Sequence, residues 1–166
     1  GEILAPGPGE CPLHQGTRFN CTVARASREG QQLVGLGLSF GGESAMRLPS
    51  LLEGYALSIC SGDFNDWTRK VASTRDRKSF MFTDEWEIPC FNMGSTFSYA
   101  ELSYLIFPRP FMVERGHDDG VGIDEWVNYE LAKIRRLYNK LGIGNRAEIE
   151  HFDGPHTIHG VGTFQF

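Results

Sequence analysis

The chain has 166 residues, of which 40% are hydrophobic and 22% are charged, a composition typical of one soluble globular domain. Its net charge of -5 disfavours nucleic acid and anionic membranes as partners, because both require a basic face. No apolar run approaches the roughly 20 residues that span a bilayer, and no secretory leader is visible, which favours a cytoplasmic location.

Residues 1–32 are rich in glycine, proline and polar residues and show no sustained period, so we expect an irregular segment there. The chain starts at Gly1 rather than Met and stops in the apolar run 164–166, which suggests a piece of a longer protein. The four cysteines are scattered and form no C-x-x-C motif, so a disulfide framework or zinc ribbon is not expected. Cys60, within an apolar run, is expected to be buried.

The segment Gly37–Gly41 has the form G-x-S-x-G, with Ser39 at its centre. An apolar strand is predicted over 33–37 and a helix over 43–52, although Pro49 conflicts with the helix. A serine on a sharp strand-to-helix turn is typical of acyl-transfer enzymes, and the N–H of Phe40 would lie at a helix N-terminus, where it can stabilise an oxyanion. The alternative is a glycine-rich turn without chemistry.

The remaining elements alternate between strands and helices. Further strands are predicted over 55–60, 111–114 and 147–152. A helix over 124–141 has Asp124 as its N-cap and Gly142 as its stop, and 161–166 is expected to open a last helix. Residues 61–108 form a helical excursion whose aromatic side chains either pack the core and a lid or line a substrate pocket. This order predicts an α/β fold with about four parallel strands and flanking helices.

Polar residues follow three of the predicted strands. Ser39 follows the first, Gly116–Asp119 the third and Asp153–His156 the fourth. Because the carboxyl ends of parallel strands share one edge, a serine, a carboxylate and an imidazole are expected to meet there, as nucleophilic catalysis requires. Alternatively, Asp118 and Asp119 cap a loop, and His156 is an ordinary loop histidine.

A metal centre is the other possibility raised by this region. His117, His151, His156 and His159 lie near the aspartates, but their spacings match no standard ligand motif. We therefore expect no metal site and no organic cofactor, and we expect His151 to be structural because it alternates with Ile149 on a strand.

Three runs together resemble the C-terminal half of a bacterial α/β-hydrolase of the acetyl-xylan-esterase-like or dienelactone-hydrolase-like group. They are GLGLSFGGESAMR (35–47), RPFMVERGHDDGVGIDEWV (109–127) and EIEHFDGPHTIHGVGTF (148–164). The resemblance covers about residues 33–166, and residues 1–32 show none. It implies Ser39 as nucleophile, His156 as general base and the Phe40 N–H as one oxyanion donor. For the acid, the pattern D-x-x-V favours Asp118, whereas G-x-x-D favours Asp119; we prefer Asp118.

The resemblance implies a serine hydrolase that acts on small-molecule or carbohydrate esters. Family members have further strands before the serine turn, which carry the second oxyanion donor, and these are not recognisable in residues 1–32. We therefore expect an exposed sheet edge through which the chain can self-associate. The alternative function is a catalytically silent hydrolase fragment. A peptidase of the prolyl-oligopeptidase type would need a propeller or lid domain that this sequence does not encode.

Overall fold

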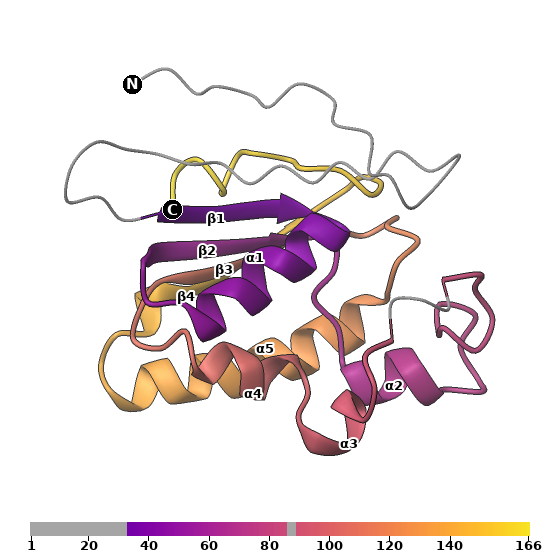
Figure 1. Cartoon of the computed structure of the whole chain (residues 1–166). Helices are drawn as coiled ribbons and strands as arrows, with labels where there is room; N and C mark the ends of the chain where they lie inside the picture. Colours follow the sequence, from indigo (N-terminus) through magenta and orange to yellow (C-terminus); the bar gives the residue numbers. More distant parts are fainter. Residues whose placement is uncertain (1–32, 86–88) are drawn as a thin grey trace.

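The computed structural model describes residues 33–85 and 89–166, and its centre is a four-stranded parallel sheet (Figure 1). The strands lie side by side in chain order, β1-β2-β3-β4. They are β1 (Leu33–Leu38), β2 (Tyr55–Ser61), β3 (Phe111–Gly116) and β4 (Ala147–Phe152). All four carboxyl ends therefore lie at one edge of the sheet. This confirms the predicted α/β fold, while the expectation for residues 1–32 lies outside the described residues.

The helices cover one face of the sheet (Figure 1). They are α1 (Phe40–Leu51), α2 (Trp67–Ala72), α3 (Met93–Thr96), α4 (Tyr99–Tyr104) and α5 (Asp124–Lys140), with a 3-10 turn η1 (Gly144–Arg146) before β4. Phe111 and Val113 of β3 pack on this side with Met46 of α1 and Ile134 of α5. None of the helices in the described part of the chain is both long and apolar enough to cross a bilayer.

The opposite face of the sheet carries a smaller apolar cluster of Leu36, Ile59 and Met112. Phe166, at the end of the C-terminal segment that follows β4, packs against it (Figure 1). Alternate strand residues thus meet different layers, since Met112 faces this segment while its neighbours on β3 face the helices. Burial on both faces explains the continuous apolar runs LVGLGL in β1 and FMV in β3.

The proline in α1 is accommodated close to the end of the helix. The helix begins at Phe40, earlier than the predicted 43, and ends at Leu51, two residues after Pro49. Arg109 donates hydrogen bonds to the carbonyl oxygens of Pro49 (2.6 Å) and Leu52 (2.9 Å). These bonds satisfy carbonyl groups that have no partner within the helix, so the helix end is stable in spite of the proline.

The excursion between β2 and β3 contains α2, α3 and α4 joined by loops, as predicted. Its aromatic side chains divide into two groups. Trp67, Phe80 and Tyr99 are buried in the main core, whereas Phe82, Phe91 and Phe97 are exposed. Trp86, also assigned to this excursion, lies outside the described residues.

The C-terminal third follows the prediction except at its helix ends. The N-cap of α5 is Ile123, so Asp124 is the first helical residue rather than the cap. Gly142 has a φ of 72°, the left-handed conformation expected of the residue that stops a helix. Residues 161–166 form turns and not the expected helix. Two helix-like hydrogen bonds occur there, from the Phe164 N–H to the Gly160 carbonyl (3.2 Å) and from the Phe166 N–H to the Gly162 carbonyl (2.9 Å).

Candidate active site

Ser39 is the single residue between β1 and α1, and its backbone is strained. Its φ of 60° and ψ of -128° lie in a region that residues with side chains rarely adopt. The conformation is held on both sides, because the Ser39 N–H donates to the Ser61 carbonyl (3.0 Å) and the Ser39 carbonyl accepts from the Glu43 N–H (3.0 Å). Such strain costs about 1–3 kcal/mol and is concentrated at functional sites.

The glycines around Ser39 are required by close backbone approaches. A Cβ at Gly37 would overlap the Gly41 carbonyl group, and a Cβ at Gly42 would overlap the Ser61 carbonyl oxygen. The turn therefore has the tight strand-to-helix geometry that projects a serine side chain away from the main chain. Ser39 is half-buried, and Phe40 begins α1 immediately after it.

In the structure His156 is paired with Asp119, whereas from the sequence we preferred Asp118 as the acid. The His156 Nδ1 lies 2.9 Å from the Asp119 Oδ2, and Asp119 is 2% exposed. Asp118 is exposed, and its N–H donates to the Gly154 carbonyl (3.0 Å). The cause is a turn closed by a bond from the Asp119 N–H to the Gly116 carbonyl (3.1 Å), which directs the second aspartate inward.

Asp119 is fixed by further donors. Its Oδ1 accepts from the Val121 N–H (2.7 Å), and its Oδ2 lies 3.4 Å from a guanidinium nitrogen of Arg115. Gly116 brings the two loops together, because a Cβ there would lie only 2.5 Å from the Gly154 carbonyl oxygen. The G-x-x-D pattern, rather than D-x-x-V, thus coincides with the aspartate that meets the histidine.

Gly62, the residue after β2, lies close to both His156 and Leu38, the residue before the serine. A Cβ at Gly62 would lie 2.7 Å from the His156 Cε1 and 2.9 Å from the Leu38 Cδ1, and Leu38 immediately precedes Ser39. Within residues 33–85 and 89–166, Ser39 Oγ and His156 Nε2 form no hydrogen bond with each other. The sheet edge thus brings the serine, the histidine and Asp119 into one neighbourhood.

A buried polar cluster under the serine turn was missed by sequence analysis. Glu43, in the first turn of α1, is 3% exposed and forms an ion pair with Arg47. Burial raises the pKa of Glu43 to about 7, against the opposing effect of the Arg47 charge. Asp63, just after β2, accepts a hydrogen bond from the Tyr99 hydroxyl (2.9 Å), and burial and the Glu43 charge raise its pKa well above the ordinary value.

Glu114 anchors the segment that carries His156. This carboxylate on β3 is 1% exposed and accepts hydrogen bonds from the hydroxyls of Ser61 and Thr163, both at 2.6 Å, and from the Gly160 N–H at 2.8 Å. Gly160 and Thr163 belong to the segment after β4, so the buried carboxylate joins that segment to the middle of the sheet. A glutamate directly after the apolar run Phe111–Val113 is the sequence signal for this role.

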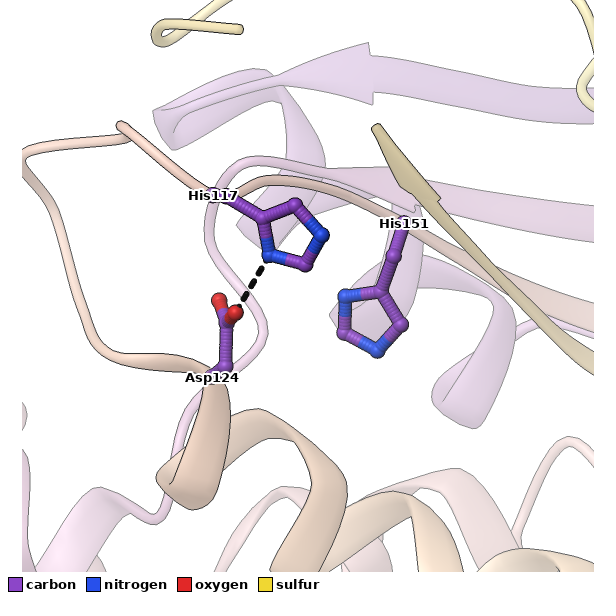
Figure 2. Close-up of side chains that lie close together, drawn as sticks. All are labelled: His117, Asp124 and His151. Carbon is purple, nitrogen blue, oxygen red and sulfur yellow. Dashed lines mark hydrogen bonds and ion pairs between the residues drawn. The ribbon is translucent and has the colours of Figure 1, made fainter. Parts of the chain in front are cut away.

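The other described histidines have partners of their own. His117 Nδ1 lies 2.5 Å from Asp124 Oδ2, and His159 Nδ1 lies 2.6 Å from Glu150 Oε1. His151 stacks on His117, with ring centres 5.2 Å apart (Figure 2). The His151 Nε2 lies 3.2 Å from Asn128 Oδ1. Burial lowers the pKa of His151. Burial acts to raise the pKa of Asp124, but hydrogen bonds from Arg115 and His117 outweigh it and lower that pKa.

Two surface hollows, of about 530 and 410 Å³, lie far from this group. They are lined by residues such as Arg135, Asn145 and Glu148, near η1 and the amino end of β4. Neither includes Ser39, Asp119 or His156, so both lie at the edge of the sheet opposite the candidate site.

Comparison with known proteins places the fold. No family model matches the sequence, and no curated protein matches it. A carbohydrate esterase family 15 glucuronoyl esterase from Caldicellulosiruptor kristjansonii matches 79% of this chain with a TM-score of 0.56 and 18% identity. Two structures of a Pyrococcus furiosus esterase match 81% of it with TM-scores of 0.50 and identities of 14% and 18%. The chain spans 40% of the first protein's length and 49% of the second's. These likenesses show that the chain shares its α/β fold with part of these esterase structures.

Proposed function

We propose that the protein to which this chain belongs is a serine hydrolase of carboxylic esters, with Ser39, His156 and Asp119 as its catalytic groups. The observation that carries the proposal is the combination of a strained serine turn with a half-buried His156 paired to the buried Asp119 at the same sheet edge. The fold shared with esterase structures supports it.

In this mechanism the Asp119 carboxylate holds His156 with its Nδ1 protonated, which leaves Nε2 as the base that takes the proton from Ser39 Oγ. The serine attacks the ester carbonyl, and His156 then gives the proton to the departing alcohol. Water, activated by the same imidazole, releases the acid from the acyl-enzyme. Catalytic hydrogen bonds often tighten only when substrate binds, so the absence of a Ser39–His156 bond without substrate is compatible with these roles.

The Phe40 N–H is proposed as one donor to the oxyanion. It begins a 12-residue helix directly after the nucleophile, where the helix dipole favours negative charge. In α/β-hydrolases a second donor comes from a loop earlier in the chain, which we leave unassigned.

Labelling of the full chain with a fluorophosphonate probe tests the proposal. We expect Ser39-dependent labelling that is lost in Ser39→Ala and strongly reduced in His156→Ala, because only an activated serine attacks the probe. Ser44→Ala is the matched control, since Ser44 lies on the same helix and its hydroxyl bonds to the Phe40 carbonyl (2.9 Å). Absence of labelling in the folded wild-type chain would support the alternative of a catalytically silent hydrolase fragment.

A further inference from the structure

We infer that His117, Asp124 and His151 form a binding site for a divalent transition-metal ion of the zinc type. Each residue offers one ligand atom, and the three atoms lie within 4.8 Å of one another. They come from three different elements: the loop after β3, the first turn of α5 and strand β4 (Figure 2). This inference is independent of the proposed hydrolase activity.

The strongest indication is a nitrogen of His151 that has no partner. His151 Nε2 faces the Asn128 side-chain oxygen, which accepts a hydrogen bond only if that nitrogen carries the proton. The other nitrogen, Nδ1, then presents a lone pair, and it is buried without any hydrogen bond. Figure 2 shows this ring directing a nitrogen toward His117 and Asp124. A buried acceptor without a donor is costly, and a metal ion would satisfy it.

The surroundings of the three ligands are those of a metal site. A ligating histidine commonly donates its other N–H to an oxygen, which fixes the ring, and Asn128 serves this purpose for His151. The Asp124 Oδ1 accepts from Arg115 Nε (2.9 Å), so Oδ2, which faces His117 Nδ1, is the oxygen that the ion would bind. Two imidazoles and one carboxylate favour zinc-like ions over calcium or magnesium, which prefer oxygen ligands.

Binding requires only a small local change. Ligand atoms around tetrahedral zinc lie about 3.3 Å apart, given Zn–N distances of about 2.0–2.1 Å. His117 Nδ1 and Asp124 Oδ2 are 2.5 Å apart and share a proton, which the ion would displace. Both side chains are partly exposed, at 43% and 32%, so they can separate and a water molecule can take the fourth position.

The test is titration of the metal-free full chain with Co²⁺, followed by visible absorption, and with Zn²⁺, followed by calorimetry. We expect one site per chain, with a cobalt spectrum that lacks the near-ultraviolet bands of thiolate ligands. His117→Gln and His151→Gln should each weaken binding at least tenfold. Asn128→Ala keeps all three ligands and should weaken it about 10- to 100-fold, as loss of an outer-shell partner does.

His159→Gln is the matched control. His159 is also exposed (40%) and paired with a carboxylate, Glu150, but among residues 33–85 and 89–166 no third ligand lies beside it, so its replacement should leave metal affinity unchanged. Zinc should also raise the Tm of the wild type and the His159 variant, and not that of His117→Gln. Equal affinity in the wild type and the His117→Gln/His151→Gln double variant, or no cobalt binding by folded wild type, would overturn the inference.

Discussion

At the scale of single residues, two adjacent aspartates have opposite surroundings. Asp119 is buried, and its carboxylate is paired with His156 and Arg115 and accepts a backbone hydrogen bond from the Val121 N–H. The Asp118 side chain is exposed to solvent. The sequence patterns D-x-x-V and G-x-x-D point to neighbouring aspartates. The direction of the turn determines which of the two aspartates meets His156. Neighbours of the same type can therefore be distinguished by experiment.

We predict that Asp119→Asn lowers fluorophosphonate labelling or ester hydrolysis by about 10⁴-fold, the effect expected when the histidine loses the partner that sets its tautomer. Asp118→Asn should retain activity within a factor of about three, because its carboxylate contacts none of the proposed catalytic groups. Rates of the two variants with the same activated ester give the comparison. A larger loss in Asp118→Asn than in Asp119→Asn would reverse the assignment.

At the scale of elements, the serine turn depends on glycines that have no room for a side chain. Gly37→Ala would drive a methyl group into the Gly41 carbonyl, where only backbone could move. We predict a loss of more than about 2 kcal/mol in the free energy of unfolding, measured by urea denaturation. In Gly54→Ala nothing lies within 4 Å of the new methyl group, so a change below about 1 kcal/mol is expected. Equal effects at both positions would contradict the close approach.

Attachment of the C-terminal segment to the sheet depends on Glu114. In Glu114→Gln an NH₂ group, which donates hydrogen bonds, replaces one of the two acceptor oxygens. The bonds from Ser61, Gly160 and Thr163 therefore cannot all persist. We predict a loss of about 1–3 kcal/mol and faster amide hydrogen exchange at residues 160–166. Glu148→Gln, on the exposed side of β4, should change neither quantity. Unchanged exchange in Glu114→Gln would show that apolar packing alone holds the segment.

Elements were more predictable than the contacts among them. Alternation of apolar runs and helical periods predicted all four strands and the long helix, because those periods depend on nearby residues. The pairing of His156 with Asp119, and the burial of Glu43 and Asp63, depend on how distant loops and helices meet. No local sequence pattern encodes such long-range contacts. Asp124 is another example, because it was predicted to cap its helix but instead bonds to Arg115 and His117.

At the scale of the whole molecule, the buried acids make stability depend on pH. The folded pKa of Glu43, about 7, lies above its ordinary value of 4.5, because burial disfavours the charged form. The folded state therefore holds this proton more tightly than the unfolded chain does. The resulting stabilisation is complete below about pH 4.5 and is lost as the pH rises through 7.

We predict that the Tm of Glu43→Gln, whose side chain cannot ionise, falls less than that of the wild type as the pH rises from about 5 to about 8. Asp63 retains its own contribution in this variant, so the dependence should be reduced and not abolished. Glu53→Gln, at an exposed position just after the same helix, should follow the wild-type curve. Parallel curves of Tm against pH for wild type and Glu43→Gln would contradict the raised pKa.

Self-association of the chain through a sheet edge stays a prediction.

The order of the strands also has a consequence in time. Because β1 to β4 lie side by side in the order in which they are synthesised, each new strand can pair with the one made just before it. In a nascent chain the serine turn could then fold well before the ribosome has added His156. The segment that carries His156 is attached to the sheet only when Thr163 can bond to Glu114. Within the described residues, the proposed site is therefore complete only after β4 has been made, and a polypeptide interrupted before β4 would have Ser39 without its proposed base.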